Sequence, residues 1–401
     1  MSVSSRNVAL YPWFKFAQNL LFWQATWFLF FQNELSGAEA ILLYAIYDLA
    51  TTLLEVPSGW ISDRIGRRPT LILSSVFGGV ACLVLASGDT FSAFILGQVL
   101  LGASIAFVSG TDSATLFEAL AADGRESEVE AQELKAWRAT FTALAVSAVI
   151  GGLAALWSER LPFVMSGVAF AAATLVAFRF AEPPRVQDTA SNLARLRDIP
   201  RALSNPALAW IFALAVLMYG YSHIPFVFGQ PFILEALSDL GWAGEAPVVS
   251  GGVSATMMIV SVLTSLIALR LRHALGLPGV LLLAFGLQVA LAAVLAASNA
   301  AIVIAVLFLR MVPSSLSGPF ILARIQPLLQ DRTRATYLSV QSLVSRIVFA
   351  ISLWLASVEA SKTDTLSFAE IRGILIWYAV IGVLAFAALA FTARRARIED
   401  R

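Results

Sequence analysis

The chain has 401 residues, of which 59% are hydrophobic and 13% are charged, and its formal net charge is +1. Average soluble domains are about 45–50% apolar and about 25% charged, so a water-soluble fold of this composition would expose apolar patches that aggregate. The composition therefore excludes an ordinary soluble protein and predicts one that lipid solvates. Cys82 is the only cysteine, which excludes an intrachain disulfide and a thiolate metal site.

Apolar segments long enough to cross a bilayer recur along the whole chain. A membrane-crossing helix needs about 20 apolar residues, and backbone groups in hydrocarbon must bond within their own segment, which favours helices over open strands. No cleavage site of the secretory type precedes the first segment, which we expect to be retained as an anchor. We predict twelve spans at 12–32, 38–61, 70–86, 91–120, 131–157, 161–180, 207–235, 248–269, 278–297, 301–325, 335–357 and 368–392.

Lysine and arginine are concentrated in alternate loops. The loop 62–69 holds three arginines and the end 394–397 holds three more, whereas the loops of the other side hold Arg160, Lys362 and Arg372. Cytoplasmic loops are the ones enriched in Lys and Arg. We therefore expect both termini in the cytoplasm and a multi-pass protein of the bacterial inner membrane.

The longest polar stretch divides the twelve spans into two sets of six. Apolar residues recur within it at helical spacing, which predicts an amphipathic helix on the inner leaflet; a solvated linker is the alternative. These apolar residues are Leu193, Leu196, Ile199 and Leu203. The predicted organisation is an N-terminal six-helix bundle (1–181), a cytoplasmic linker (182–206) and a C-terminal six-helix bundle (207–401).

The loop after the second span carries the most specific motif of the chain. It reads Gly59-Trp-Ile-Ser-Asp-Arg-Ile-Gly-Arg-Arg-Pro-Thr-Leu71, and Gly66 within it permits a tight turn because glycine tolerates positive φ. Asp63 is the acid among cations and can pair with Arg67. The loop resembles G-x-L-x-D-R-x-G-R-R/K-x-x-L of the major facilitator superfamily, with Ile for Leu at one position.

This resemblance implies a latch between the two halves on the cytoplasmic side. In the family, the aspartate also faces the start of the eleventh span, and the arginine pairs with an acid at the inner end of the fourth. Here the eleventh span starts near 333–335, and its positive dipole end would favour a carboxylate. A simple positively charged topogenic loop is the alternative. The latch candidates are Gly59, Asp63, Arg64, Gly66, Arg67, Arg68 and Glu118.

A narrower resemblance links the chain to a branch of the family whose members are often named drug or metabolite exporters. The segment 55–59 (Glu-Val-Pro-Ser-Gly) is similar to that branch's E-I-P-T-G, and 107–114 is similar to its F-x-S-G-x-D/E-x-A. Two departures weaken the expectation of drug–proton antiport. Gln98 replaces the family's arginine in the fourth span, and Ser147-Ala148 replace the Gly-Pro before a glycine pair in the fifth.

Among the charged residues inside the predicted spans, five stand out: Asp48, Glu55, Asp112, Arg310 and Arg346. Such residues are costly in hydrocarbon and are retained with a partner or a role. Asp48 and Glu55 are seven residues apart, on one face of a helix. At about 1.5 Å per residue, Arg346 lies at a depth between them.

We therefore predict that Arg346 pairs with Asp48 or Glu55 across the two halves, as a gate or as a static neutral pair. Arg138 on the fifth span matches Asp112 in depth and is its predicted partner. The proton-carrier candidates are Asp48, Glu55 and Asp112.

The family resemblance also implies that the first, fourth, seventh and tenth spans line a central cavity. Aromatic walls with a few polar groups suit an amphipathic organic solute, although membrane tryptophans also commonly face the lipid interface. The candidates are Asn19, Trp23, Gln24, Trp27, Tyr219, Tyr221, His223, Arg310 and Ser314.

These expectations combine into a secondary active transporter that moves a small organic solute by alternating access. We expect proton-coupled efflux; proton-coupled uptake of a nutrient or anionic metabolite is the alternative, and a non-transporting sensor is a third class. No clustered nucleophile, acid pair, metal-ligand set or nucleotide-binding loop indicates an enzyme or a cofactor. The expected partners are the solute, protons and the bilayer, with no nucleic acid, and we expect a monomer.

Overall fold

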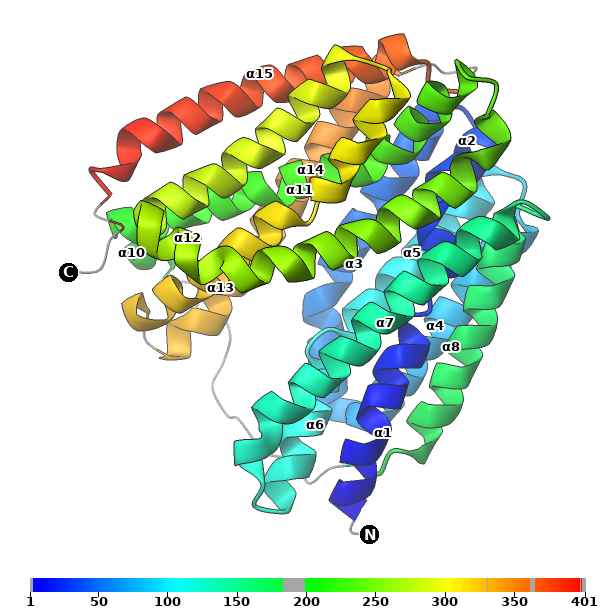
Figure 1. Cartoon of the computed structure of the whole chain (residues 1–401). Coiled ribbons are helices and arrows are strands. Elements are labelled where there is room, and N and C mark those ends of the chain that lie inside the picture. Colours follow the sequence, from blue (N-terminus) through cyan, green and yellow to red (C-terminus); the bar gives the residue numbers. More distant parts are fainter. Residues whose placement is uncertain (1–2, 183–198, 330, 361–364, 397, 399–401) are drawn as a thin grey trace. The chain divides into compact units, whose positions relative to one another are not determined.

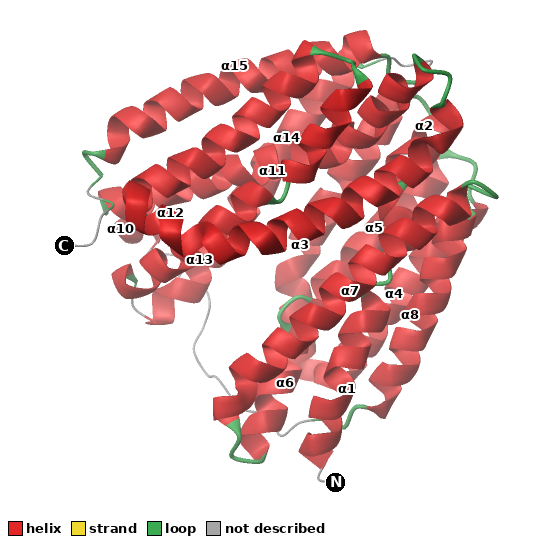
Figure 2. Cartoon of the chain, viewed as in Figure 1, coloured by secondary structure: helices red, strands yellow, loops and turns green. Residues whose placement is uncertain are grey.

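The computed structural model describes residues 3–182, 199–329, 331–360, 365–396 and 398. All regular elements in these ranges are helices (Figures 1 and 2). The described residues form two compact units. Unit 1 takes those within Met1–Asp188, Gly244–Ala255 and Thr363–Thr365, and unit 2 takes those within Thr189–Ala243, Thr256–Lys362 and Leu366–Arg401.

Unit 1 is a bundle in which α4 packs against α5 and α8, and α3 packs against α5. In Figure 1 its helices run from blue through cyan to green. Its elements are α1 (Val3–Gln18), η1 (Phe22–Ala25), α2 (Trp27–Glu34), α3 (Gly37–Ile65), α4 (Arg67–Ser87), α5 (Phe91–Val108), α6 (Thr111–Ala122), η2 (Glu126–Glu128), α7 (Val129–Ala155) and α8 (Leu161–Arg179).

Unit 2 is organised around α11, which packs on α14, α15, η4 and α13. Side chains fix these contacts: Tyr337 donates to the Leu208 carbonyl at 2.7 Å, and Trp210 donates to that of Leu389 at 3.0 Å. The elements of this half are α10 (Ile199–Leu203), α11 (Pro206–Ser238), η3 (Ala243–Glu245, its last two residues in unit 1), α12 (Ala246–Ala297, its first ten residues in unit 1), η4 (Ala301–Leu309), α13 (Val312–Leu328), α14 (Asp331–Glu359) and α15 (Phe368–Ala393).

Ten helical stretches among the described residues are long and apolar enough to cross a membrane. One of them, Ala243–Ala297, contains Gly276 with φ 70° and ψ 171°, so it consists of two helices. This break separates the predicted spans 248–269 and 278–297. A total of twelve crossings stays a prediction, as do the boundaries of the linker. Leu193 and Leu196 of its predicted amphipathic helix lie outside the described residues, whereas Ile199 and Leu203 lie in a helix.

The first predicted span, 12–32, is not one helix. The chain is helical from Val3 to Gln18, breaks, and resumes as η1 and α2. Asn19 donates its side-chain amide to the Lys15 carbonyl at 2.7 Å, and the Phe22 amide donates to the Ser166 hydroxyl at 2.9 Å. The Phe22 amide, which a continuous helix would pair with a carbonyl four residues earlier, bonds to a side chain of α8 instead. The prediction of an unbroken helix was therefore wrong here.

Close backbone packing joins α7 to the first turns of α12 within unit 1. An alanine Cβ at position 251 would overlap the carbonyl oxygen of Ala148, whereas a Cβ at position 252 would meet nothing within 4 Å. The two neighbouring glycines therefore differ in what they contact although both lie in the same helix. Gly251 is the residue that permits the close approach.

We predict that Gly251→Ala lowers the thermal unfolding temperature of the purified protein and that Gly252→Ala does not. Overpacking a filled site costs about 1–3 kcal/mol, whereas alanine in an open helical position gains roughly 0.5–1 kcal/mol over glycine. Thermal unfolding of the two variants in one detergent measures the difference. Equal unfolding temperatures would show that α7 and α12 do not pack this closely.

Candidate functional site

Arg67 is the centre of an ionic cluster at one end of unit 1, formed with Asp63, Glu118 and Ser62 (the Arg67 cluster). Its guanidinium lies 2.9 Å from Glu118 and 2.8 Å from Asp63, and it donates to the Ser62 hydroxyl at 2.9 Å. Both ion pairs predicted from the loop motif are therefore present. The two acids differ in environment: the side chain of Glu118 is 9% exposed and that of Asp63 is 69% exposed.

Glu182 closes the same end of the unit, and the sequence prediction missed it. The first amides of α4, those of Arg67 and Arg68, donate to its two carboxylate oxygens at 2.6 and 3.0 Å. A carboxylate is stabilised at a helix N-terminus, where the amides and the helix dipole point at it. Gly66 has φ 108°, and a Cβ there would overlap this carboxylate. Gly66 is thus required both for the turn and for the cap.

Two of the remaining latch candidates, Arg64 and Arg68, contact other residues of unit 1. Arg64 stacks over the Trp60 ring at 3.9 Å, and Arg68 donates to the Phe178 carbonyl at 2.8 Å. At Gly59 a Cβ would meet nothing within 4 Å, so no close approach requires a glycine there. The predicted approach of Asp63 to the eleventh span joins the two units and stays a prediction.

Lys15 pairs with Asp112 inside unit 1. The ammonium lies 2.6 Å from the carboxylate, with side-chain exposures of 23% and 9%. We expected Arg138 as the partner of Asp112, and this was wrong, because Arg138 is exposed on α7. The depth estimate assumed one helix over 91–120, but Gly110 adopts φ 74° and separates α5 from α6. The turn directs Asp112 at α1 instead.

A second polar contact lies one helical turn from Lys15. The Tyr11 hydroxyl donates to the Glu133 carboxylate of α7 at 3.4 Å. Neither residue was among the sequence candidates, nor was Lys15, although Lys15 falls inside the predicted first span. The position of Lys15, a charged residue near the start of a predicted span, could have indicated that it has a partner.

Asp48 and Glu55 both lie on α3 and differ in burial. Asp48 is 1% exposed, near the middle of the helix, and its backbone carbonyl accepts a hydrogen bond from Thr52 at 2.8 Å. Glu55 is partly exposed and accepts one from the Ser109 hydroxyl of the α5–α6 turn at 3.4 Å. Their predicted pairing with Arg346 joins the two units and stays a prediction.

In unit 2, Arg310, Arg346 and His223 each contact an aromatic ring. The Arg346 guanidinium lies over Tyr219 at 5.5 Å, and that of Arg310 over Phe226 at 4.6 Å. His223 lies 4.3 Å from the Tyr219 ring and 5.3 Å from that of Phe349, between centroids. Three of the predicted cavity or coupling residues, Tyr219, His223 and Arg310, thus share one site with Arg346.

Two predicted cavity residues are packed into the interior of their units. Trp27 is 2% exposed and packs against Phe28, Phe31 and Tyr44. Tyr221 is buried and donates to the Tyr378 carbonyl at 2.6 Å. These two residues belong to the packed core, and the prediction that they line a cavity was wrong.

The other predicted cavity residues are partly exposed: Asn19, Trp23, Gln24 and Ser314. Asn19 donates to the Lys15 carbonyl of α1, and Trp23 stacks against Phe163 at 6.3 Å between ring centroids. The neighbour of Ser314, Ser315, makes the contact between α13 and α12, with its hydroxyl 2.6 Å from that of Ser261. The involvement of these four residues in solute binding stays a prediction.

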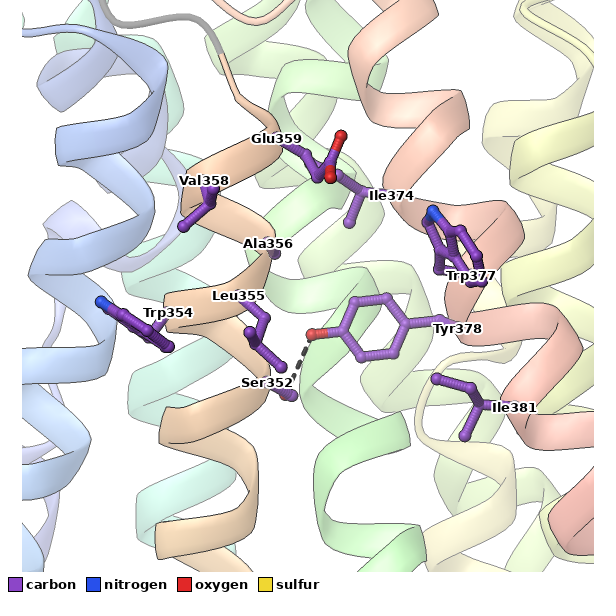
Figure 3. A pocket seen from close by; sticks show the side chains of 10 residues that line it. All are labelled: Ser352, Trp354, Leu355, Ala356, Val358, Glu359, Ile374, Trp377, Tyr378 and Ile381. Carbon is purple, nitrogen blue, oxygen red and sulfur yellow. Dashed lines mark hydrogen bonds between the residues drawn. The ribbon is translucent and has the colours of Figure 1, made fainter.

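Unit 2 also has a groove of about 460 Å³ between α14 and α15 (Figure 3). Trp354 and Trp377 line it, with 57% and 63% of their surface exposed. The Tyr378 hydroxyl donates to that of Ser352 at 2.9 Å across it, as the dashed line marks. Exposed tryptophans on apolar helices are typical of a lipid-facing surface. Among the described residues, no three His, Cys, Asp or Glu side chains gather as metal ligands.

We predict that Glu118→Gln destabilises unit 1 more than Asp63→Asn does, although both acids bind Arg67. Removing the buried acid leaves Arg67 with an unsatisfied charge-assisted bond, a loss of about 1–3 kcal/mol, whereas an exposed ion pair contributes below about 1 kcal/mol. Chemical denaturation in mixed micelles measures both changes. If Asp63→Asn proves the more costly substitution, the assignment of the structural role to Glu118 is wrong.

Comparison with known proteins places these features in a family. The model of the Major Facilitator Superfamily matches residues 13–353. The multidrug transporter MdfA of Edwardsiella ictaluri is 26% identical over 222 residues, covering 47% of this chain and 52% of that protein. The multidrug resistance protein MdtM of Salmonella typhimurium is 27% identical over 248 residues, covering 57% and 56%. The matches span about half the length of these relatives.

Solved structures agree in fold over nearly the whole chain. The nucleoside transporter NupG superposes with a TM-score of 0.77 at 14% identity, covering 97% of this chain and 98% of that one. At this identity the likeness concerns the fold alone. With the Arg67 cluster in the motif loop, helices as the regular elements of the described residues and a family match over most of its length, the chain belongs to the Major Facilitator Superfamily.

Proposed function

We propose that the protein is a proton-coupled secondary transporter that exports a small organic solute across the bacterial inner membrane by alternating access. It acts as a monomer, with twelve spans and both termini in the cytoplasm. Family membership supports transport, and the names of the relatives, multidrug transporter and multidrug resistance protein, support export. The excess of arginine in alternate loops supports the orientation.

The single observation that carries proton coupling is the Lys15–Asp112 pair in the interior of unit 1. Protonation of Asp112 removes the charge that holds Lys15, so a proton and Lys15 compete for one carboxylate. Tyr11 and Glu133 lie one turn away on α1 and α7 and offer a second position for a proton. Asp48, buried in α3, is the alternative carrier in the same unit.

The Arg67 cluster supports a latch at the cytoplasmic end of the carrier. Glu118 and Glu182 hold Arg67 and the start of α4 in place. Asp63 keeps most of its side chain exposed although it pairs with Arg67, so it remains accessible to a partner outside the cluster. We infer that Glu118 and Glu182 shape the loop and that Asp63 makes the contact that changes during the cycle.

Proton-coupled uptake of an anionic metabolite is the second candidate function. Arg310 and Arg346 of unit 2 favour it, because a guanidinium can bind an anionic group of a solute through charge-assisted hydrogen bonds. Gln98, which stands where the family resemblance expects an arginine, also favours it. Export and uptake use the same cycle and differ in the direction that the gradient drives.

Transport and coupling are tested together in proteoliposomes. A thermal-shift screen of ethidium, tetracycline and benzoate first identifies a probe that stabilises the purified protein, and that probe is then used for counterflow and for flux driven by a pH gradient. We expect Asp112→Asn to retain counterflow and to lose gradient-driven flux. Glu126→Gln, an acid in η2 outside the predicted spans, is the control and retains both.

Two outcomes would contradict the proposal. A probe that binds but shows no counterflow in the wild-type protein indicates a sensor rather than a transporter. Gradient-driven flux that survives Asp112→Asn and also Asp48→Asn shows that neither of these carboxylates carries the proton.

A further inference from the structure

Unit 2 has a second groove, of about 400 Å³, between the first turns of α11 and the last turns of α15 (the α11–α15 groove). Both helix ends lie near the C-terminus that Figure 1 marks. Arg395 supplies a positive charge to a lining that is otherwise uncharged among the described residues. The residues that line the groove include Pro206, Trp210 and Ala213 from α11, and Leu389, Thr392 and Arg395 from the end of α15 and the turn after it.

Trp210 fixes the shape of the groove. It is 5% exposed, and its indole donates to the Leu389 carbonyl at 3.0 Å, so it joins α11 to α15 where the groove lies. One turn further along α11, Ala213 is exposed and carries only a methyl group. The Thr392 hydroxyl donates to the Ala388 carbonyl at 2.7 Å within α15. The groove therefore has a largely apolar wall, which the packing of two helices holds in place.

The surface of α15 beside the groove is suited to lipid. This helix is long and apolar enough to cross a membrane, and its residues Leu384 and Phe391 are 66% and 68% exposed. Apolar side chains that a membrane-spanning helix exposes are solvated by acyl chains, which are as apolar as leucine. An apolar molecule that fills the groove therefore comes from the bilayer.

Arg395 places a cation at the end of this apolar surface. It is exposed, two residues after the end of α15 at Ala393, and its guanidinium lies over the Phe391 ring at 4.9 Å. An aromatic face attracts a cation without cancelling its charge. In the orientation proposed above, this end lies at the cytoplasmic surface, where basic pockets between membrane helices bind anionic head groups. The cation and the apolar wall match the two parts of a phospholipid.

We propose that the α11–α15 groove binds one anionic phospholipid of the inner leaflet. Its phosphate contacts Arg395, because a guanidinium can bind a phosphate through two parallel hydrogen bonds. One acyl chain lies against Trp210, Ala213 and Leu389, where each methylene that leaves water adds to the affinity. The proposal requires a chain embedded in a membrane and does not depend on transport or on its direction.

Three probes test the class of ligand: dioleoyl-phosphatidylglycerol, dioleoyl-phosphatidylcholine, and glycerol 1-phosphate, which is a head group without chains. Binding to the full-length protein, freed of lipid in detergent, is measured by native mass spectrometry. We expect phosphatidylglycerol to bind about ten-fold or more tightly than phosphatidylcholine, whose trimethylammonium group is repelled by Arg395. Glycerol 1-phosphate, which has no chain for the groove, is expected to show no binding at the same concentrations.

Arginine variants test the position of the phosphate. Arg395→Gln is expected to weaken phosphatidylglycerol binding about ten-fold and to leave phosphatidylcholine binding within about two-fold. Arg395→Lys, which keeps the charge and loses the two parallel hydrogen bonds, retains part of the affinity. Arg394→Gln is the matched control, since Arg394 is exposed in the same turn and does not line the groove. This control binds the lipids within about two-fold of the wild type.

An alanine variant tests the position of the acyl chain without a change of charge. Ala213→Phe fills the groove, so we expect phosphatidylglycerol binding to fall about ten-fold as the phenyl group displaces the chain. Ala387→Phe is its control, because Ala387 is exposed on α15 outside the lining of the groove. The unfolding temperature of each variant confirms that it is folded.

Four results would overturn the proposal. Equal binding of the two phospholipids excludes recognition of the anionic head group. An equal loss in Arg394→Gln and Arg395→Gln shows a general attraction to the basic end of the chain. Phosphatidylglycerol binding that survives Ala213→Phe excludes the groove, and glycerol 1-phosphate that binds as tightly as the lipid shows an anion site on Arg395 alone.

Discussion

The structure depends on one constraint, namely that a charge in an apolar layer needs a counter-charge or a function. Unit 1 meets the constraint internally. Lys15 pairs with Asp112, and Arg67 pairs with Glu118, in both cases between helices that are distant in sequence. In unit 2, Arg310 lies over the Phe226 ring and Arg346 over the Tyr219 ring. The Lys15–Asp112 pair is the physical reason to look for the proton in unit 1.

Helix breaks place the charged groups where these pairs form. The break after Gln18, the turn at Gly110 and the 3-10 segment that ends before Arg310 each change the direction of a side chain relative to an ideal helix. Unit 1 is in turn fixed at both ends by ionic contacts. Arg67 joins α4 to α6 at one end, and Arg160 joins α8 to Glu34 at 2.8 Å and also to Asp89 at the other. These ion pairs therefore join the helices of unit 1 at its two ends, on either side of its apolar middle.

The sequence was sufficient for the fold class and for the Arg67 cluster, and insufficient for the interior pairs. The loop motif fixes the spacing of Asp63 and Arg67, so their pairing was predictable. Glu118 was predictable because it lies at a helix end that comes close to this loop. The Lys15–Asp112 pair was missed because the depths of charged residues were estimated from the helical rise per residue, as if each span were one ideal helix. The cap by Glu182 depends on tertiary packing between residues 115 positions apart. Trp27 was misassigned because hydropathy does not tell a core-facing aromatic residue from a cavity-facing one.

The pairing of Lys15 with Asp112 inside unit 1 is tested most directly by a double-mutant cycle. The free energy of unfolding is measured in mixed micelles for Lys15→Gln, for Asp112→Asn and for the double variant. Removing one partner strands the other in an apolar interior, so each single variant is expected to lose about 1–3 kcal/mol. The double variant should be at least as stable as either single variant. Single losses that simply add in the double variant would show that the two charges are not coupled, and this would contradict the balance of charge within unit 1.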